Sequence, residues 1–320
     1  MLSGFLLGIF FISLLKKFSL SYGLLVPKGI PVIGGIGLGL SFIFVSLSSF
    51  FLFRLISKEV AGIIVSSSIM LVFGVIDDRH ELSIRIKFLV QIIATGLLVF
   101  FGIKTRIVYI GNPLNIIITF IWVVGITNAF NHLDVMDGLA SGTAIIISYA
   151  FFVISLLNGD ARAAILSLAL IGPVLSFFLY NLPPAKIYMG NAGSHFLGFV
   201  LATIALIISY APLERKVALL SPLLILGFPI FDTTFLFLMR IIKNNFPFKK
   251  SNDHLALRYL ALGYSKKKTL FSLLTLCLFF CLCGIVVSQV SNLWGMATVV
   301  FAILVSLITS IKMSKVVVNG

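Results

Sequence analysis

The chain has 320 residues, of which 60% are hydrophobic and only 11% are charged. Soluble domains carry about 25% charged residues, so this composition excludes an ordinary soluble enzyme and predicts an all-α polytopic integral membrane protein. The net charge of +14 does not indicate a nucleic-acid partner, because basic residues of membrane proteins gather in cytoplasmic loops.

Eleven apolar segments approach the length that crosses a bilayer. They lie at about 1–15, 33–53, 60–76, 85–103, 114–128, 139–157, 162–180, 194–211, 217–239, 268–289 and 294–311. The first and fifth are short, so we predict about 10–11 transmembrane helices. The first has no basic segment before it and no A-x-A-like cleavage site after it, which favours a retained span over a signal peptide. We find no linker and predict a single transmembrane domain over 1–320.

The loops after odd-numbered segments and the C-terminal tail hold 17 basic residues, against 7 on the other side. The positive-inside rule therefore places these loops in the cytoplasm and the N-terminus outside. Most acidic residues fall on the same side, which predicts one active site at the cytoplasmic face. They are Asp77, Asp78, Glu81, Asp134, Asp137, Asp232 and Asp253.

The first polar motif is VPKGIPVIGG at 26–35, where prolines and a glycine pair interrupt any helix. Lys28 is either a cation beside a phosphate or part of an ordinary connector.

The second motif, at 74–91, places Asp77 and Asp78 at the end of an apolar span. Adjacent carboxylates there favour a divalent cation, a cationic partner or a shared proton, although a solvated loop is the alternative. Lys87 and Gln91 are four residues apart and share a helix face.

The third motif, NAFNHLDVMDGLASG at 128–142, repeats a polar residue every three positions. On an α-helix each such step drifts by about 60° around the axis, so neighbours touch but all four cannot share one narrow face. Their carboxylate and amide oxygens are typical ligands of Mg²⁺. We leave His132 without a role. The four are Asn128, Asn131, Asp134 and Asp137.

The fourth motif, PPAKIYMGNAGSHFLG at 183–198, surrounds Gly190 and Gly193 with small residues. Exposed backbone N–H groups in such a turn suit a phosphate, and a span that begins near Ser194 would point its N-terminal dipole at the same site.

Two further clusters lie toward the C-terminus. Asp232, inside the ninth segment, is either a functional carboxylate or a hydrogen-bonding group between spans. In the basic segment 249–268, His254 and Arg258 are four residues apart and predict a phosphate-binding helix face. The three cysteines, at 277, 281 and 283, lie in one apolar run and give no disulfide framework.

Together these motifs resemble the polyprenyl-phosphate N-acetylhexosamine-1-phosphate transferases, and the match runs in order from about residue 26 to 268. NAFNHLDVMDGLA is similar to the family pattern N-A-x-N-x-x-D-x-x-D-G-L-A, and MGNAGSHFLG to M-G-D-x-G-S-x-x-L-G. The nearest branch starts O-antigen, enterobacterial common antigen and teichoic acid linkage units. Phospho-N-acetylmuramoyl-pentapeptide transferase is a relative. The resemblance implies transfer of a sugar 1-phosphate from a UDP-sugar to a polyprenyl phosphate at the plasma (inner) membrane, with release of UMP.

The resemblance also implies roles for individual residues. It assigns catalysis to Asp77, Asp78, Asp134 and Asp137. It assigns Mg²⁺, with Mn²⁺ as an alternative, to Asn131 and Asn191. It assigns substrate binding to Lys28, Lys87, Asn128, Gly190, Gly193, His254 and Arg258. Membrane lipid is a further partner, nucleic acid is not expected, and a homodimer is left open.

Four departures from the family pattern qualify these expectations. Asn191 stands where the family has a metal-binding aspartate, and Val135 replaces a glycine. Val32 replaces the usual arginine, and HLALR keeps only His254 and Arg258 of a histidine-rich motif. The alternative function is therefore a non-catalytic homologue that binds polyprenyl phosphate or scaffolds a polysaccharide complex. A transporter coupled through Asp232 is disfavoured, because no inverted repeat is found.

Overall fold

The computed structural model describes residues 1–210, 214–244 and 253–318, apart from the side chain of Lys28. The described residues form α-helices and two short 3-10 helices, without strands, which confirms the all-α prediction. The chain separates into two compact units, Met1–Ile208 and Ser209–Gly320. The predicted single domain over 1–320 stays a prediction. The predicted phosphate contact of Lys28 lies outside the described side chains.

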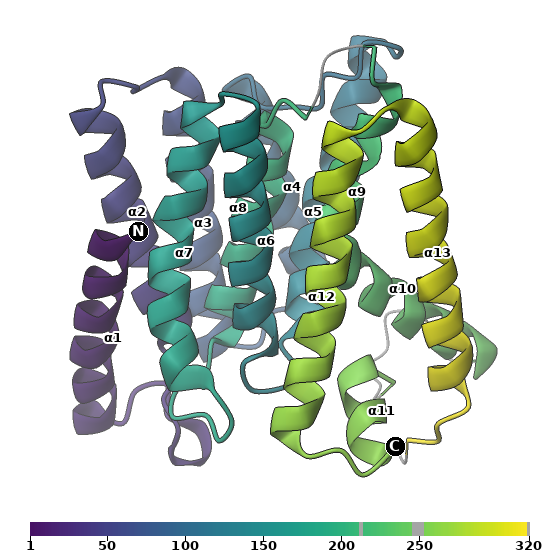
Figure 1. The fold of residues 1–320 in the computed structure, drawn as a ribbon. Helices are drawn as coiled ribbons and strands as arrows, with labels where there is room; N and C mark the ends of the chain where they lie inside the picture. Colours follow the sequence, from purple (N-terminus) through teal and green to yellow (C-terminus); the bar gives the residue numbers. More distant parts are fainter. Residues whose placement is uncertain (211–213, 245–252, 319–320) are drawn as a thin grey trace. The chain divides into compact units, whose positions relative to one another are not determined.

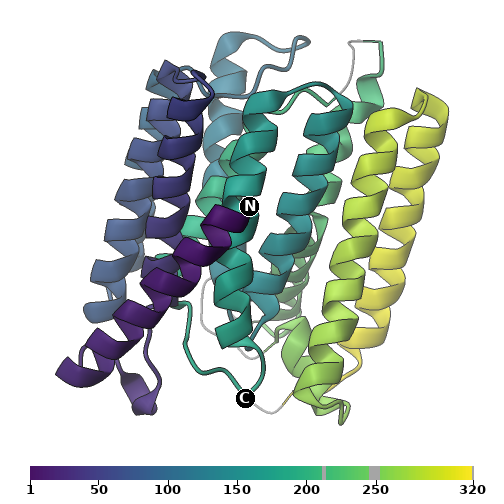
Figure 2. The ribbon, with the colours of Figure 1, turned by 60° about the vertical axis from the view of Figure 1, so that its left-hand side comes forward.

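Unit 1 consists of helices that run up and down beside one another (Figure 1). A 3-10 turn, η1 (Pro27–Gly29), precedes the second of them. Figure 2 shows the first helix lying obliquely across the seventh, against which it packs. The helices are α1 (Leu2–Tyr22), α2 (Gly34–Leu52), α3 (Lys58–Arg79), α4 (Ile84–Phe100), α5 (Asn112–Leu133), α6 (Leu139–Leu157), α7 (Ala161–Asn181) and α8 (Gly190–Ile207).

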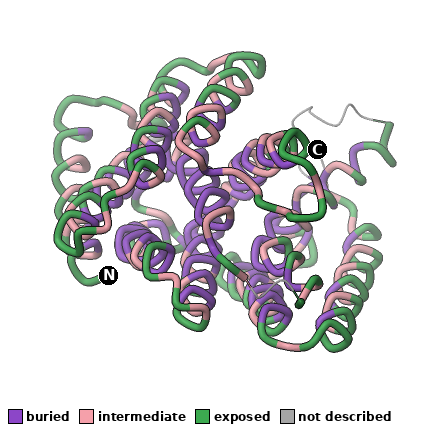
Figure 3. Tube along the Cα trace, turned by 90° about the horizontal axis from the view of Figure 1, so that it is seen from above, coloured by how far each residue is buried: buried purple, intermediate pink, exposed green. Residues whose placement is uncertain are grey.

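Helix α8 is the central helix of unit 1, since it packs against α2, α3, α5 and α6 and most of its residues are buried. Helices α3 and α8 touch where Gly74 faces Ala192. A Cβ at Gly74 would lie 2.3 Å from the Cα of Ala192, so this close approach requires glycine. Viewed along the helices in Figure 3, buried residues lie on the faces that the helices turn toward one another. The contact brings the end of α3 against the start of α8.

Unit 2 contains η2 (Lys216–Leu220), α9 (Ser221–Ile225), α10 (Gly227–Ile242), α11 (Leu255–Ala261), α12 (Lys266–Gln289) and α13 (Asn292–Ser314). A bend of 70° separates Lys216–Ile225 from Gly227–Ile242. Helix α12 packs against α9 and α13 and carries the three cysteines, which are buried and free. Their burial in an apolar helix suits cysteine side chains that pack as small apolar groups.

Nine of the described helices are long and apolar enough to cross a membrane, and the bent pair makes a tenth if it forms one span. Helix α4 has 17 residues, which is the lower limit of the usual length of a membrane-crossing helix. The chain is therefore a multi-pass membrane protein, as its composition predicted. Each of the eleven predicted segments corresponds to one of these helices or to the bent pair.

Candidate functional site

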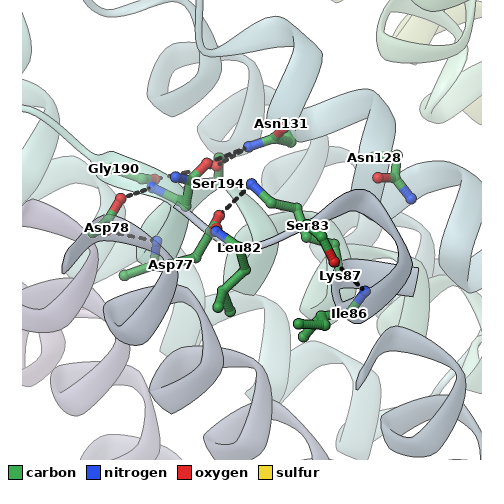
Figure 4. Close-up of polar contacts among 12 residues, drawn as sticks. Asp77, Asp78, Leu82, Ser83, Ile86, Lys87, Asn128, Asn131, Gly190 and Ser194 are labelled. Atoms are coloured by element: carbon green, nitrogen blue, oxygen red, sulfur yellow. Dashed lines mark hydrogen bonds and ion pairs between the residues drawn. The ribbon is translucent and has the colours of Figure 1, made fainter. Parts of the chain in front are cut away.

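The paired aspartates at the end of α3 have separate sets of partners (Figure 4). Asp77 is buried, and its carboxylate accepts the backbone N–H of Leu82 at 2.8 Å. It also forms an ion pair with Lys87, whose Nζ lies 2.5 Å away. The Ser83 hydroxyl caps the start of α4, so a short turn returns Lys87 to the end of α3. The ion pair with Lys87 offsets the electrostatic repulsion between the adjacent carboxylates of Asp77 and Asp78.

Asp78 instead caps the start of α8. Its carboxylate oxygens accept the backbone N–H groups of Asn191 at 2.6 Å and Ala192 at 3.0 Å. A carboxylate is favourable there because the first N–H groups of a helix have no partner within the helix. Gly190 has a φ of +72°, and a Cβ at this position would lie 2.4 Å from Asp78 Oδ2. The capping contact therefore depends on glycine at position 190.

This arrangement changes the expected phosphate site in the MGNAGS turn. The predicted span began near Ser194, whereas α8 begins at Gly190. Two of the N–H groups predicted to face a phosphate are paired with Asp78. Gly193 is buried, and a Cβ there would lie 2.2 Å from Met189 Cγ and 2.8 Å from the Cα of Gly35. The structure places Gly193 in a packing contact, and its predicted substrate contact stays a prediction.

The loop that precedes α2 is held against this same turn by the backbone. Gly34 N donates to Tyr188 O at 3.1 Å, and Gly35 N donates to Met189 O at 3.0 Å. Tyr188 N donates in turn to Pro31 O at 2.9 Å. The first and fourth sequence motifs are thereby brought together, although about 150 residues separate them.

The third motif adds two asparagines from α5. Asn131 Nδ2 donates to Asn191 Oδ1 and to Ser194 Oγ, both at 3.0 Å. Asn128 Nδ2 donates to Gln91 Oε1 at 2.7 Å, so this amide faces α4 and lies apart from Asn131 in Figure 4. Helix α5 extends to Leu133, beyond the predicted end at 128. Asn128 and Asn131 therefore lie on α5, whereas Asp134 and Asp137 follow its end. The three-residue spacing does not place all four residues on one helix.

Asp134 and Asp137 lie in the turn between α5 and α6, which is braced by α7. Asp137 Oδ2 accepts the N–H of Ala185 at 3.2 Å. Asn181, at the end of α7, accepts the N–H of Gly138 at 2.9 Å and donates to Ile187 O at 3.0 Å. Sequence reasoning missed Asn181. Its position at the end of an apolar span, one residue away from the proline pair Pro183-Pro184, is the signal that was available.

Asp134 is the carboxylate whose electrostatic surroundings are least favourable. Burial, together with the nearby carboxylates of Asp78 and Asp137, raises its pKa to about 7. A group with such a pKa carries a proton over much of the acidic range. Its pKa is raised in part because three carboxylates lie near one another, and a bound cation would neutralise their negative charge.

The residues present fit a hard cation such as Mg²⁺, but only in part. Within the described ranges, no three His, Cys, Asp or Glu side chains are grouped closely enough to hold a metal ion. Both hydrogens of Asn131 Nδ2 are used, which leaves its carbonyl oxygen available as a ligand. The carboxylates of Asp134 and Asp137 are oxygen donors of the same kind. Mg²⁺ commonly takes only one or two carboxylates and completes its shell with water and substrate phosphate, which this donor set allows.

In unit 2, Asp232 holds the start of α11. Asp232 Oδ1 accepts the N–H of Leu255 at 3.1 Å, and Oδ2 lies 3.5 Å from His254 Nδ1. Asp232 thus contacts the start of α11, and the two sequence-based alternatives for it, a functional carboxylate and a hydrogen-bonding group between spans, stay open. Burial alone would raise the pKa of Asp253, but Lys243 at 2.6 Å, with Arg258, lowers it below its ordinary value.

Arg258 is buried and binds the end of α13. Its Nε and Nη2 donate to Asp253, and its Nη1 donates to Met313 O at 2.8 Å and Val316 O at 2.6 Å. We call these four residues the Arg258 clasp. A guanidinium has five N–H donors, and these contacts use four of them. The contacts favour a structural role over the predicted binding of nucleotide-sugar phosphates, and the predicted substrate contacts of His254 and Arg258 stay predictions.

Comparison with known proteins gives consistent similarities. The profile described as glycosyl transferase family 4 matches residues 60–209. A probable undecaprenyl-phosphate N-acetylglucosaminyl 1-phosphate transferase from Bacillus subtilis is 34% identical, over 77% of this chain and 71% of the relative. The undecaprenyl-phosphate alpha-N-acetylglucosaminyl 1-phosphate transferase of Thermotoga maritima is 30% identical, over 81% and 77%. A phospho-N-acetylmuramoyl-pentapeptide-transferase from Limosilactobacillus fermentum is 45% identical over 28% of each chain.

Proposed function

Because this chain belongs to glycosyl transferase family 4, we propose that it transfers a sugar 1-phosphate from a UDP-sugar to a polyprenyl phosphate. A phosphate oxygen of the lipid attacks the phosphorus that carries the sugar. The bond from that phosphorus to the bridging oxygen breaks, UMP leaves, and a lipid diphosphate sugar remains. The sugar is an N-acetylhexosamine, in line with the names of the Bacillus subtilis and Thermotoga maritima relatives.

The observation that carries this proposal is the meeting of three distant motifs at one end of unit 1. Asp78 contacts Asn191, Asn131 contacts Asn191 and Ser194, and Asp77 holds Lys87. All of these residues lie at or near the ends of apolar helices. A lipid phosphate lies at headgroup level and a nucleotide arrives from water, so this level suits the reaction.

Within this site, we assign the lipid phosphate to the Asp77–Lys87 pair. Lys87 is a cation at this end of unit 1, and its side chain is 21% exposed. A phosphate that reaches Lys87 would share the ammonium with Asp77. Asp77 would then keep the ammonium oriented and would accept a proton from the incoming phosphate. Charge-assisted contacts of this kind are stronger than neutral hydrogen bonds.

We assign the nucleotide-sugar diphosphate to the turn that carries Asp134 and Asp137. Mg²⁺ held there with Asn131 would neutralise negative charge on the departing phosphate. Asn191, whose oxygen already accepts Asn131 Nδ2, would be a neutral ligand in the same shell. Asn181 would keep the turn in place through its contact with Gly138.

The neutral amide of Asn191 also favours one alternative, a homologue that binds polyprenyl phosphate without transferring sugar. A carboxylate would supply charge to Mg²⁺ at this position, and an amide does not. In that case the Asp77–Lys87 pair would still bind the lipid phosphate.

A transfer assay in membranes distinguishes the two functions. Radiolabelled UDP-sugars, offered one at a time with undecaprenyl phosphate, should give labelled lipid and UMP. Asp77→Asn should lower transfer by at least ~100-fold, because the carboxylate that orients Lys87 and accepts the proton is lost. The matched control is Asp160→Asn at the N-cap of α7, at the opposite end of unit 1, where asparagine caps as well as aspartate. Lipid binding without transfer of any sugar would establish the alternative.

We further propose that the site-bearing end of unit 1 faces the cytoplasm at the plasma (inner) membrane. The 17-to-7 division of basic residues supports this orientation. A cysteine introduced at Glu81, in a background without the three native cysteines, should be labelled only after a reagent enters the cell. Labelling from outside would reverse the orientation.

A further inference from the structure

His195 is a buried imidazole that nothing in the proposed reaction uses. It lies in α8, one turn after Asn191, and is 1% exposed. Neither of its ring nitrogens has a hydrogen-bond partner within the described parts of the chain. Its ring packs against Phe73 of α3, with centroids 5.5 Å apart and planes inclined at 48°.

An imidazole without a partner is unfavourable in such a place. A neutral ring always carries one N–H donor and one acceptor nitrogen, and both lose water on burial. Leucine would fill the same space without this penalty. Buried polar groups are almost always hydrogen-bonded in native proteins, so an unpaired one indicates a partner that the protein chain does not supply.

The neighbours of His195 identify the chemistry of that partner. The Asp77–Lys87 pair lies near enough to the ring to interact with it electrostatically. Phe73, which touches it, lies one turn before Asp77 on the same face of α3. Ser194, the next residue in the chain, contacts Asn131. His195 therefore lies one helical turn deeper in unit 1 than the Asp77–Lys87 pair, on the side away from the ends of the helices.

We propose that His195 hydrogen-bonds a phosphate oxygen of the lipid acceptor, next to Lys87. This inference rests on the proposed function, because it extends the acceptor half of the same site. The polyprenyl chain of the acceptor lies in the apolar region, so the phosphate attached to it binds on the membrane side of the site and can reach a deeper donor. A nucleotide diphosphate, which stays in water, binds nearer to the turn at Asp134. His195 thus distinguishes the acceptor from the donor substrate.

Kinetic measurements on two variants test this role. His195→Leu removes both nitrogens at similar volume, and His195→Gln keeps a donor and an acceptor. In the leucine variant the KM for polyprenyl phosphate should rise about tenfold or more, the magnitude expected for a lost hydrogen bond to a charged group. The KM for the UDP-sugar should stay unchanged, and glutamine should restore much of the loss. Equal changes in both KM values, or none, would overturn the proposal.

A spectroscopic measurement tests the same contact without relying on transfer. The chain has only four histidines, so ¹⁵N-histidine spectra can be assigned by replacing each in turn. The His195 signals should move when farnesyl phosphate is added and stay in place with UMP. An equal shift with inorganic phosphate alone would overturn the lipid assignment, and no shift with any probe would overturn the contact. If the protein transfers no sugar but His195 responds to farnesyl phosphate, the proposed function fails and the contact stands.

Discussion

Replacing Gly190 by alanine tests the contact that joins α3 to α8. Gly190 has a φ of +72°, a region that L-residues adopt at a cost of about 1–2 kcal/mol. The added Cβ would lie 2.4 Å from Asp78 Oδ2 and 2.6 Å from Val32 Cγ1. Asp78 would have to leave the N–H groups of Asn191 and Ala192. The substitution therefore combines backbone strain with the loss of a carboxylate cap.

A matched control separates these two effects. Gly159 has a φ of +70°, and a Cβ there would meet nothing within 4 Å. Gly159→Ala therefore carries only the backbone penalty. Gly190→Ala should lose in addition two hydrogen bonds to a charged group, each worth about 1.5–3 kcal/mol. The difference between the two variants should be about 3–6 kcal/mol.

The assay is thermal unfolding of the purified protein in detergent micelles, with both variants measured beside the parent. A difference of about 3 kcal/mol corresponds to roughly 6–12 °C in Tm for a unit of this size. Adding Asp78→Ala to Gly190→Ala should lower Tm little further, because the cap is already lost and the two effects are not additive. If Gly190→Ala and Gly159→Ala lowered Tm equally, the capping role of Asp78 would be refuted.

Two further predictions concern the polar turn. Asn191→Asp should shift the Mg²⁺ dependence of transfer to lower concentration and leave the sugar preference unchanged, because a carboxylate adds charge to the shell; an unchanged midpoint would remove Asn191 from the metal site. Asp134→Asn should raise the Tm of the metal-free protein more at pH 8 than at pH 5. The folded-state pKa of Asp134 lies above its unfolded value, so its destabilising effect grows as pH rises toward about 7 and is complete above it. An equal gain at both pH values would show that Asp134 does not titrate in this range.

The sequence predicted the end of unit 1 at which the polar motifs meet but not how they pair. Apolar runs locate the helices, and the one-sided distribution of acidic residues locates the site. Asp77 and Asp78 are adjacent in the chain, yet a helix turns by about 100° per residue. That rotation sends one carboxylate to Lys87 of α4 and the other to the start of α8, and composition cannot show it.

A different reason explains why Asn181 and His195 were not identified from the sequence. Asn181 and His195 are single polar residues within or beside apolar helices, so no repeating pattern distinguishes them from ordinary packing positions. Their importance depends on partners from other helices. Asn181 acquires such partners in the turn before α6, whereas His195 has none among the described residues.

The Arg258 clasp has a consequence for the biogenesis of unit 2. Met313 and Val316 follow Arg258 by 55 and 58 positions, so the ribosome makes them long after the arginine. Until they emerge, only Asp253 among the hydrogen-bonding partners of Arg258 has been synthesised, and water must solvate the remaining N–H groups. We therefore expect the segment around α11 to stay hydrated while α12 enters the membrane. We expect the Arg258 clasp to close only when α13 is in place, because that helix brings Met313 and Val316 to the arginine.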